Sequence, residues 1–316
     1  MSGRPAAWNR APQKGVKSMA KRMLTITQRE NRVWKLMTAP AMVFLILLSV
    51  YPMVFNVYNS FFDWNLARPD SGHFVGLANY IDAFTNANLG TAFFNTLVFM
   101  FWAVAVEFTL GFALALLLST YKGPSKIIRS LMITPTMIAP IVASLMWLFM
   151  FNADYGVIKW LLQLCGVENP PAILASRTWA MPAVIAVDVW QWTPFVMLTI
   201  FAGITALPKD LIEASCVDGA NSLQRLIHVI VPSLKPVIAV VLLMRVMDSF
   251  KSFEVIYMLT KGGPGNATET VSYYAYKVGF SFFEIGQCSA ICLLIGFVVT
   301  AICSALNRLI SDEWSV

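Results

Sequence analysis

Residues 213–232, with the sequence EASCVDGANSLQRLIHVIVP, form a polar interruption between two apolar segments in the second half of the chain. Glu213 lies in the first turn of a predicted helix, where the helix dipole favours an acidic side chain. Gly219 is expected to end that helix after two turns. A second, amphipathic segment follows over 222–231, and Pro232 is expected to break it. The stretch therefore predicts a short helix, a turn and another helix that lie across the face of a membrane.

The rest of the sequence is that of a membrane protein. The chain has 316 residues, of which 58% are hydrophobic and 13% charged, and its mean hydropathy is +0.66. About 20 apolar residues cross a bilayer, and an isolated segment satisfies its backbone in lipid only as a helix. Six segments qualify: 37–59, 92–118, 128–151, 180–205, 236–258 and 286–308. We therefore expect an all-α, polytopic membrane protein with six transmembrane helices.

The distribution of basic residues orients these helices. Nine of the 23 Lys and Arg residues lie in the N-terminal segment 1–36, and alternate sides of the six spans hold 16 and 5 in total. Cytoplasmic loops carry the excess of positive charge, so both termini and the 206–235 loop are expected in the cytoplasm. This divides the chain into a basic cytoplasmic leader (1–36), a six-span domain (37–308, with a core from about 92) and a short tail (309–316). Membrane orientation explains the net charge of +6, so nucleic-acid binding is not expected.

Several classes of chemistry lack their sequence motifs. The five cysteines show no metal-ligand spacing, and no GxxxxGK[ST] phosphate-binding loop occurs. The two histidines, His73 and His228, fall in loops on opposite sides of the predicted membrane. We expect no catalytic residues, no metal site and no enzyme activity in this chain.

The opening stretch also resembles a known family signature. Glu213-Ala214-Ser215, then Gly219 and then Val229-Ile230-Val231-Pro232 resemble the EAA loop of binding-protein-dependent ABC importer permeases of the carbohydrate-uptake branch. The usual form is Glu-Ala-Ala, three residues, Gly, nine residues and Ile-x-Leu-Pro, and this chain keeps every spacing with small or isosteric exchanges. The likeness covers roughly residues 37–308. The positions that it assigns to coupling with an ATPase are Glu213, Ala214, Ser215, Asp218, Gly219 and Pro232.

The resemblance implies a function and a set of partners. In such permeases the loop is a coupling helix that docks into a cleft on a separate ATPase subunit, which binds ATP and Mg²⁺; the permease itself binds no cofactor. The resemblance further implies that this chain lies in the bacterial inner membrane and pairs there with a second permease subunit, expected to form a heterodimer. It also implies two ATPase subunits and an extracytoplasmic solute-binding protein. Without the family resemblance, residues 213–232 are also compatible with a merely solvated loop or with a DNA-binding helix-turn-helix. The second helix runs directly into a span, however, which leaves no free recognition helix.

Polar groups inside two spans mark a candidate solute path, because charge within a bilayer is costly. One face of the fourth span carries residues at i, i+3, i+4 and i+7 spacing: Asp188, Gln191, Trp192 and Phe195. The fifth span repeats this spacing with Arg245, Asp248, Ser249 and Ser252. It also contains Lys251 and Glu254, and Glu254 is expected on the side of the helix opposite Arg245. The family resemblance implies substrate contacts from the same two stretches, and aromatic rings with hydrogen-bonding groups suit sugars.

Two questions stay open at this point. Arg245 and Asp248 are i, i+3 neighbours, so they are either a self-neutralising structural pair or part of the solute path. The sequence favours the permease subunit of an ATP-driven importer for a sugar, oligosaccharide or related polyol. The alternative is a proton-coupled secondary carrier that uses Asp188 and Asp248 as proton relays.

Overall fold

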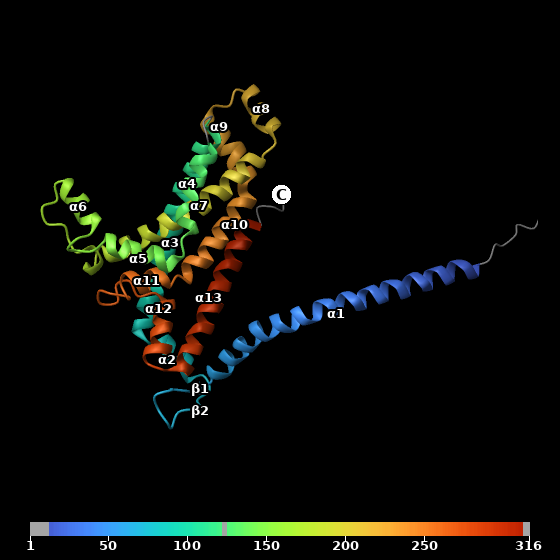
Figure 1. The fold of residues 1–316 in the computed structure, drawn as a ribbon, viewed down its shortest axis with the longest axis horizontal. Coiled ribbons are helices and arrows are strands. Elements are labelled where there is room, and N and C mark those ends of the chain that lie inside the picture. Colours follow the sequence, from blue (N-terminus) through green and yellow to red (C-terminus); the bar gives the residue numbers. More distant parts are fainter. Residues whose placement is uncertain (1–12, 122–124, 312–316) are drawn as a thin grey trace, which may run out of the picture. The chain divides into compact units, whose positions relative to one another are not determined.

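The computed structural model describes residues 13–121 and 125–311, and the chain divides into two compact units, residues 1–56 and 57–316. In the first unit the structure describes helix α1 (Gln13–Asn59), of which residues 57–59 are assigned to the second unit (Figure 1). Its apolar part, Val33–Asn59, is long enough to cross a membrane and contains the first predicted span. The helix continues through residue 36 without a break, and the proposed leader and tail boundaries stay predictions. Residues 1–12 and 312–316 lie outside the described part of the chain.

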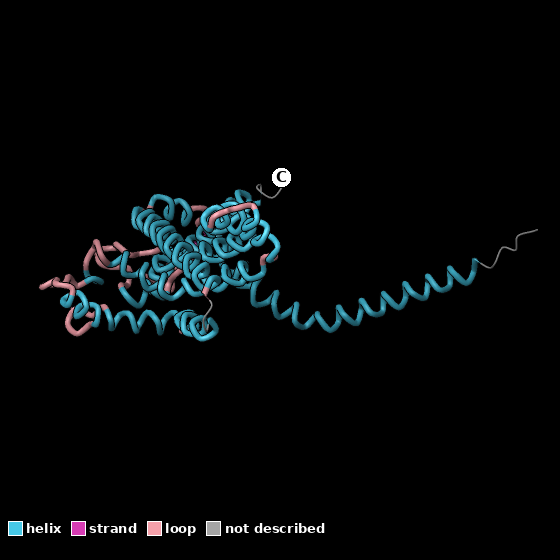
Figure 2. Tube along the Cα trace, turned by 90° about the horizontal axis from the view of Figure 1, so that it is seen from above, coloured by secondary structure: helices cyan, strands magenta, loops and turns pink. Residues whose placement is uncertain are grey.

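The second unit is almost entirely helical, as the tube drawing shows (Figure 2). A two-stranded antiparallel hairpin, β1 (Phe62–Asp63) and β2 (His73–Phe74), follows α1. The long helices are α3 (Ala87–Thr120), α7 (Ala180–Ala206), α10 (Val231–Phe250) and α13 (Ile285–Ser311). The shorter helices are α2 (Ala78–Thr85), α4 (Ser125–Met137), α5 (Pro140–Met150), α6 (Val157–Leu164), the 3-10 turn η1 (Ile173–Ala175), α8 (Lys209–Val217), α9 (Ser222–Arg225), α11 (Glu254–Leu259) and α12 (Val271–Tyr276). Two π-helical turns, η2 (Leu226–Ile230) and η3 (Lys277–Ser281), complete the unit.

The described residues contain five helical segments that are long and apolar enough to cross a membrane, or six if the bent pair α4–α5 is counted as one span. This confirms the expected all-α, polytopic fold. The third predicted span is not a single straight helix, however, because the apolar parts of α4 and α5 meet at an angle of 92°. Pro140 begins α5 and has no backbone N–H to continue the ladder of α4. The amide Nε2 of Gln191 donates a hydrogen bond of 3.0 Å to the carbonyl of Ile138 at the bend.

The fifth predicted span differs from the expectation at both ends. Pro232 does not break a helix, because α9, η2 and α10 follow one another without interruption. The π-helical turn η2 lies directly before this proline, where the regular hydrogen-bond ladder loses a donor. At the other end, α10 stops at Phe250 and α11 begins at Glu254. The regular helix is interrupted over residues 251–253, and Glu254 lines the same cavity as Arg245, so the expected position of Glu254 opposite Arg245 is wrong.

Helices α3, α7 and α10 pack together and hold the buried polar residues. Small side chains allow the close approach that membrane helices use. A Cβ atom on Gly111 of α3 would lie only 2.8 Å from Val196 of α7, so a glycine is required at this crossing. Apolar residues surround the contact, including Ala115, Met197 and Ile200, all fully buried. The packing brings the central parts of α3, α7 and α10, which are far apart in the sequence, into one buried layer.

Candidate functional site

Arg245 on α10 is the centre of a buried ionic cluster. Its side chain is only 2% exposed, and its Nε donates to Glu107 Oε2 at 2.6 Å while Nη2 reaches Glu107 Oε1 at 2.9 Å. The same Nη2 contacts Asp188 Oδ2 at 2.9 Å and Ser249 Oγ at 3.1 Å. The Trp192 ring covers the guanidinium, with 4.9 Å between Arg245 Cζ and the ring centroid. One cation therefore links carboxylates from α3 and α7, which is the kind of compensation that a buried charge requires.

This geometry argues against one of the two open interpretations, the structural pairing of Arg245 with Asp248. Among the described residues, the ion pairs of Arg245 are with Glu107 and Asp188, and Asp248 is exposed. The side chain of Arg245 forms its ion pairs with acids on α3 and α7, and its contact within its own helix is with Ser249. Glu107 is fully buried, and sequence reasoning missed it as a partner. A signal was present, since Glu107 is an isolated acid inside the second predicted span, where an unpaired charge is costly.

A polar cavity of about 330 Å³ lies beside the cluster. It brings together six of the predicted path residues with four more, and its lining is Asp188, Gln191, Trp192, Arg245, Asp248, Ser252, Pro140, Lys251, Glu254 and Val255. The break between α10 and α11 places Glu254 on the same cavity as Arg245. The other two predicted residues do not line it. Ser249 is 2% exposed and bonded to Arg245, and Phe195 packs in an apolar cluster.

Gln191 shapes this cavity as well as lining it. Its Nε2 binds the Ile138 carbonyl, and its own backbone carbonyl accepts a 2.8 Å hydrogen bond from Thr136 Oγ1. Both partners belong to the bent α4–α5 segment, and Pro140 from that segment also lines the cavity. One side chain of α7 thus fixes the irregular backbone beside a candidate solute site, where broken membrane helices commonly occur.

The cavity can hydrogen-bond a polyhydroxylated molecule from several directions. The carboxylates of Asp248 and Glu254 are exposed, as is the Lys251 ammonium group, and these three side chains have no ion-pair partner among the described residues. The Trp192 ring adds an aromatic surface. No group of His, Cys, Asp and Glu side chains in the described part of the chain has the arrangement of a metal site. The volume lies near the lower end of the range of small-molecule sites.

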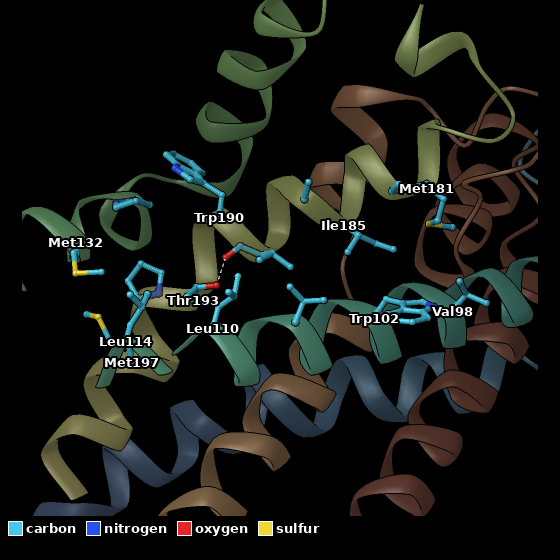
Figure 3. A pocket seen from close by; sticks show the side chains of 16 residues that line it. Val98, Trp102, Leu110, Leu114, Met132, Met181, Ile185, Trp190, Thr193 and Met197 are labelled. Atoms are coloured by element: carbon cyan, nitrogen blue, oxygen red, sulfur yellow. Dashed lines mark hydrogen bonds between the residues drawn. The ribbon is translucent and has the colours of Figure 1, made fainter. Parts of the chain in front are cut away.

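A second cavity is larger but chemically unsuitable for a polar solute. It measures about 840 Å³ and lies between α3, α4 and α7, where Trp102, Leu110, Ile185 and Met197 are among the lining side chains (Figure 3). Its hydroxyl group, on Thr193, donates internally to the Val189 carbonyl at 2.6 Å. Apart from this hydroxyl and the indole N–H groups of Trp102 and Trp190, the lining is apolar and offers few partners to replace the water around sugar hydroxyls. Its chemistry therefore fits a sugar poorly despite its size.

The predicted coupling loop forms a helix, a turn and a second short helix. Helix α8 ends at Val217, and Gly219 has φ +77°, a left-handed conformation that L side chains rarely adopt. Asn221 caps α9 by accepting from the Gln224 N–H at 2.8 Å, while the Gln224 side chain accepts from the Asn221 N–H at 2.9 Å. This reciprocal capping box fixes the start of the second helix. Figure 1 shows α8 and α9 at one end of α10, with α11 and α12 towards the other.

The loop presents an unpaired acid and several apolar side chains. Glu213 and Ala214 are exposed, and the Glu213 carboxylate has no hydrogen-bond or ion-pair partner among the residues that the structure describes. Val217 is 88% exposed and Leu223 64% exposed. Ser215 instead faces inward, where its Oγ donates to the Ile212 carbonyl at 2.7 Å. Asp218 and Gly219 are exposed at the turn, whereas Pro232 lies at the start of α10.

Comparisons with known proteins agree with this architecture. A probable ABC transporter permease of Sinorhizobium fredii is 38% identical over 87% of this chain and 88% of its own length. The trehalose/maltose transport system permease of Thermococcus litoralis is 33% identical over 84% of this chain and 89% of its own length. The trehalose transport system permease of Mycobacterium tuberculosis is 35% identical over 84% of each chain.

A solved structure shares the fold. A chain of a bacterial ABC transporter that imports the acidic polysaccharide alginate aligns with a TM-score of 0.80 over 92% of this chain and 99% of that chain, at 21% identity. The family model for the inner membrane component of binding-protein-dependent transport systems matches residues 107–314, which include α7, the coupling loop and α10. The chain belongs to the family of binding-protein-dependent transport system inner membrane components, the permease subunits of ABC importers.

Proposed function

We propose that this permease carries a sugar, oligosaccharide or related polyol through the polar cavity beside Arg245. The observation that carries the proposal is the cavity lining, in which carboxylates, an amide, a hydroxyl and an indole ring converge within membrane-spanning helices. Hydroxyl-rich solutes need both donors and acceptors, and ring faces pack on their C–H surfaces. Two relatives are named for trehalose transport, which makes trehalose the first solute to test.

The proposal extends to the partners of the chain. Helix α8 and the turn at Gly219 form the docking surface for a separate ATPase, and Glu213 offers a carboxylate to a basic group there. Two such ATPase subunits hold ATP and Mg²⁺, and a second permease subunit, expected to be a sister chain, completes the membrane part. A solute-binding protein delivers substrate from outside the cell. Both termini then lie in the cytoplasm, on the side of α8.

Reconstitution tests the proposal. The permease is purified with its ATPase and sister subunits, placed in liposomes and supplied with the solute-binding protein, radiolabelled trehalose and a panel of other sugars and polyols. Uptake is expected to require hydrolysable ATP on the ATPase side and to continue after a protonophore collapses the proton gradient. Uptake that persists without ATP and stops with the protonophore would instead support the proton-coupled carrier.

A further inference from the structure

Five aromatic side chains form a continuous cluster around α11 and α12: Phe253, Tyr257, Tyr273, Tyr276 and Phe280. The shortest contacts are 5.0 Å between the ring centroids of Phe253 and Tyr276 and 5.1 Å between those of Tyr276 and Phe280. The Tyr276 and Phe280 rings are nearly parallel, at 24°. All five side chains are at least partly exposed, and Phe280, at the end of the cluster, is 68% exposed. We call this set the aromatic cluster.

The aromatic cluster is not simply part of the apolar core. The opposite face of α11 supplies core residues, since Val255, Ile256 and Leu259 are buried against α5 and α7. Phe253 and Tyr257 instead face Tyr273 and Tyr276. The rings therefore cover one another incompletely and leave an aromatic surface open.

A neighbouring tyrosine shows what a structural role looks like in this region. Tyr274 is only 5% exposed, and its hydroxyl accepts a 3.0 Å hydrogen bond from Asn86 Nδ2. The Tyr273 hydroxyl has no hydrogen-bond partner among the described residues. A tyrosine hydroxyl is protonated near neutral pH and can donate a hydrogen bond, and burial and the nearby Glu269 carboxylate raise the pKa of Tyr273 further. The aromatic cluster thus combines ring faces with at least one unused polar group.

The aromatic cluster adjoins the polar cavity along the chain. Phe253 is flanked in sequence by Ser252 and Glu254, which both line that cavity. From there the rings continue through α12 to η3, on a part of the chain that lies away from the coupling loop (Figure 1).

We propose that the aromatic cluster is a stacking subsite for the pyranose ring of a saccharide, placed ahead of the polar cavity on the extracytoplasmic side. This inference rests on the proposed function, because it needs a sugar as the transported solute. A pyranose has an apolar C–H face and a polar hydroxyl edge, which match an exposed tyrosine ring and its hydroxyl. Adjacent rings allow the sugar to move from one stacking position to the next without full rehydration.

The subsite is tested by substitutions that remove an aromatic ring but keep an apolar side chain in its place. Tyr276→Leu removes the ring and keeps an apolar side chain, whereas Tyr276→Phe keeps the ring. Phe280→Leu provides a second ring removal at a highly exposed position where folding is not at risk. The matched control is Phe297→Leu, which removes the ring of a 74% exposed aromatic side chain on α13.

The assay is initial uptake of radiolabelled trehalose, or of the sugar that the wild-type complex imports best, in ATP-loaded proteoliposomes with saturating solute-binding protein. Each leucine variant of the aromatic cluster should lower the uptake rate roughly two- to tenfold, the range expected for one aromatic contact. Tyr276→Phe and Phe297→Leu should stay near the wild-type rate, with complex yield and basal ATP hydrolysis unchanged in all.

Three results would overturn the inference, and they are distinguishable. If the wild-type complex imports sugar and both leucine variants match its rate, the aromatic cluster is not a subsite, although the proposed function stands. A loss in Tyr276→Phe as large as in Tyr276→Leu would also reject ring stacking. If the wild-type complex imports no saccharide from the panel, the proposed function fails and this inference fails with it.

Discussion

Replacing Arg245 by methionine should destabilise the permease more than neutralising either of its acidic partners. Arg245→Met keeps a long apolar side chain but leaves the carboxylates of Glu107 and Asp188 buried side by side without a cation. Glu107→Gln leaves Arg245 paired with Asp188, and Asp188→Asn leaves the two-pronged bond between Arg245 and Glu107. The arginine substitution is expected to be the more damaging because two carboxylates share one guanidinium cation.

The contacts set the size of the expected effects. Glu107 is 0% and Arg245 2% exposed, so water cannot replace a lost partner. Removing one member of a buried pair typically costs about 3–5 kcal/mol, and we expect this cost for Arg245→Met. Losing hydrogen bonds while Arg245 keeps one carboxylate partner costs less, about 1–3 kcal/mol, which we expect for Glu107→Gln and Asp188→Asn.

Folded abundance and thermal melting of the purified complex in detergent measure these effects. Glu254→Gln is the matched control, because Glu254 is exposed and outside the cluster, and it should behave as wild type. The reasoning is refuted if Arg245→Met melts with the wild type, or if Glu107→Gln is the more damaging substitution.

Three further substitutions follow from the described geometry. Gly219→Val should destabilise the loop conformation by about 1–2 kcal/mol, because φ is +77° at this position. A Cβ atom there meets nothing within 4 Å, so backbone strain alone causes the effect, and less ATPase should co-purify with the variant. Glu213→Lys should reverse attraction at the ATPase contact and reduce substrate-stimulated ATP hydrolysis, whereas normal co-purification and full stimulation would exclude Glu213 from coupling. Gln191→Leu should leave the Ile138 carbonyl without its donor and cost about 1–3 kcal/mol, and a melting temperature equal to that of wild type would show that this bond does not stabilise the bend.

Much of the fold could be predicted because bilayer physics acts on local sequence. Runs of about 20 apolar residues identify the spans, and a glycine six positions after Glu213 correctly indicated a turn. The break between α4 and α5 was missed because hydropathy averages over Pro135 and Pro140. At Pro232 the sequence predicted a break that the structure does not have. A proline usually marks the end of a helix, but here a π-helical turn directly before it accommodates the proline.

The sequence predicted most of the residues that line the candidate site, but not which side chains form ion pairs there. Helical periodicity selected six of the ten cavity residues from two spans. It could not identify the partner of Arg245, because Glu107 is 138 residues away in sequence and only the packing of α3 against α10 brings them together. An i, i+3 neighbour such as Asp248 is the pairing that local spacing suggests, and tertiary contacts replaced it.

Chemical modification of Ser252→Cys tests most directly whether the polar cavity is the solute path. Ser252 lines the cavity but is outside the ionic cluster, and the five native cysteines would first be replaced. The measurement is the rate of maleimide labelling of the reconstituted complex with and without trehalose and solute-binding protein, followed by ATP-driven uptake. The account predicts that the transported sugar slows labelling and that the labelled complex no longer imports it. Labelling that sugar does not affect, with uptake intact afterwards, would contradict it.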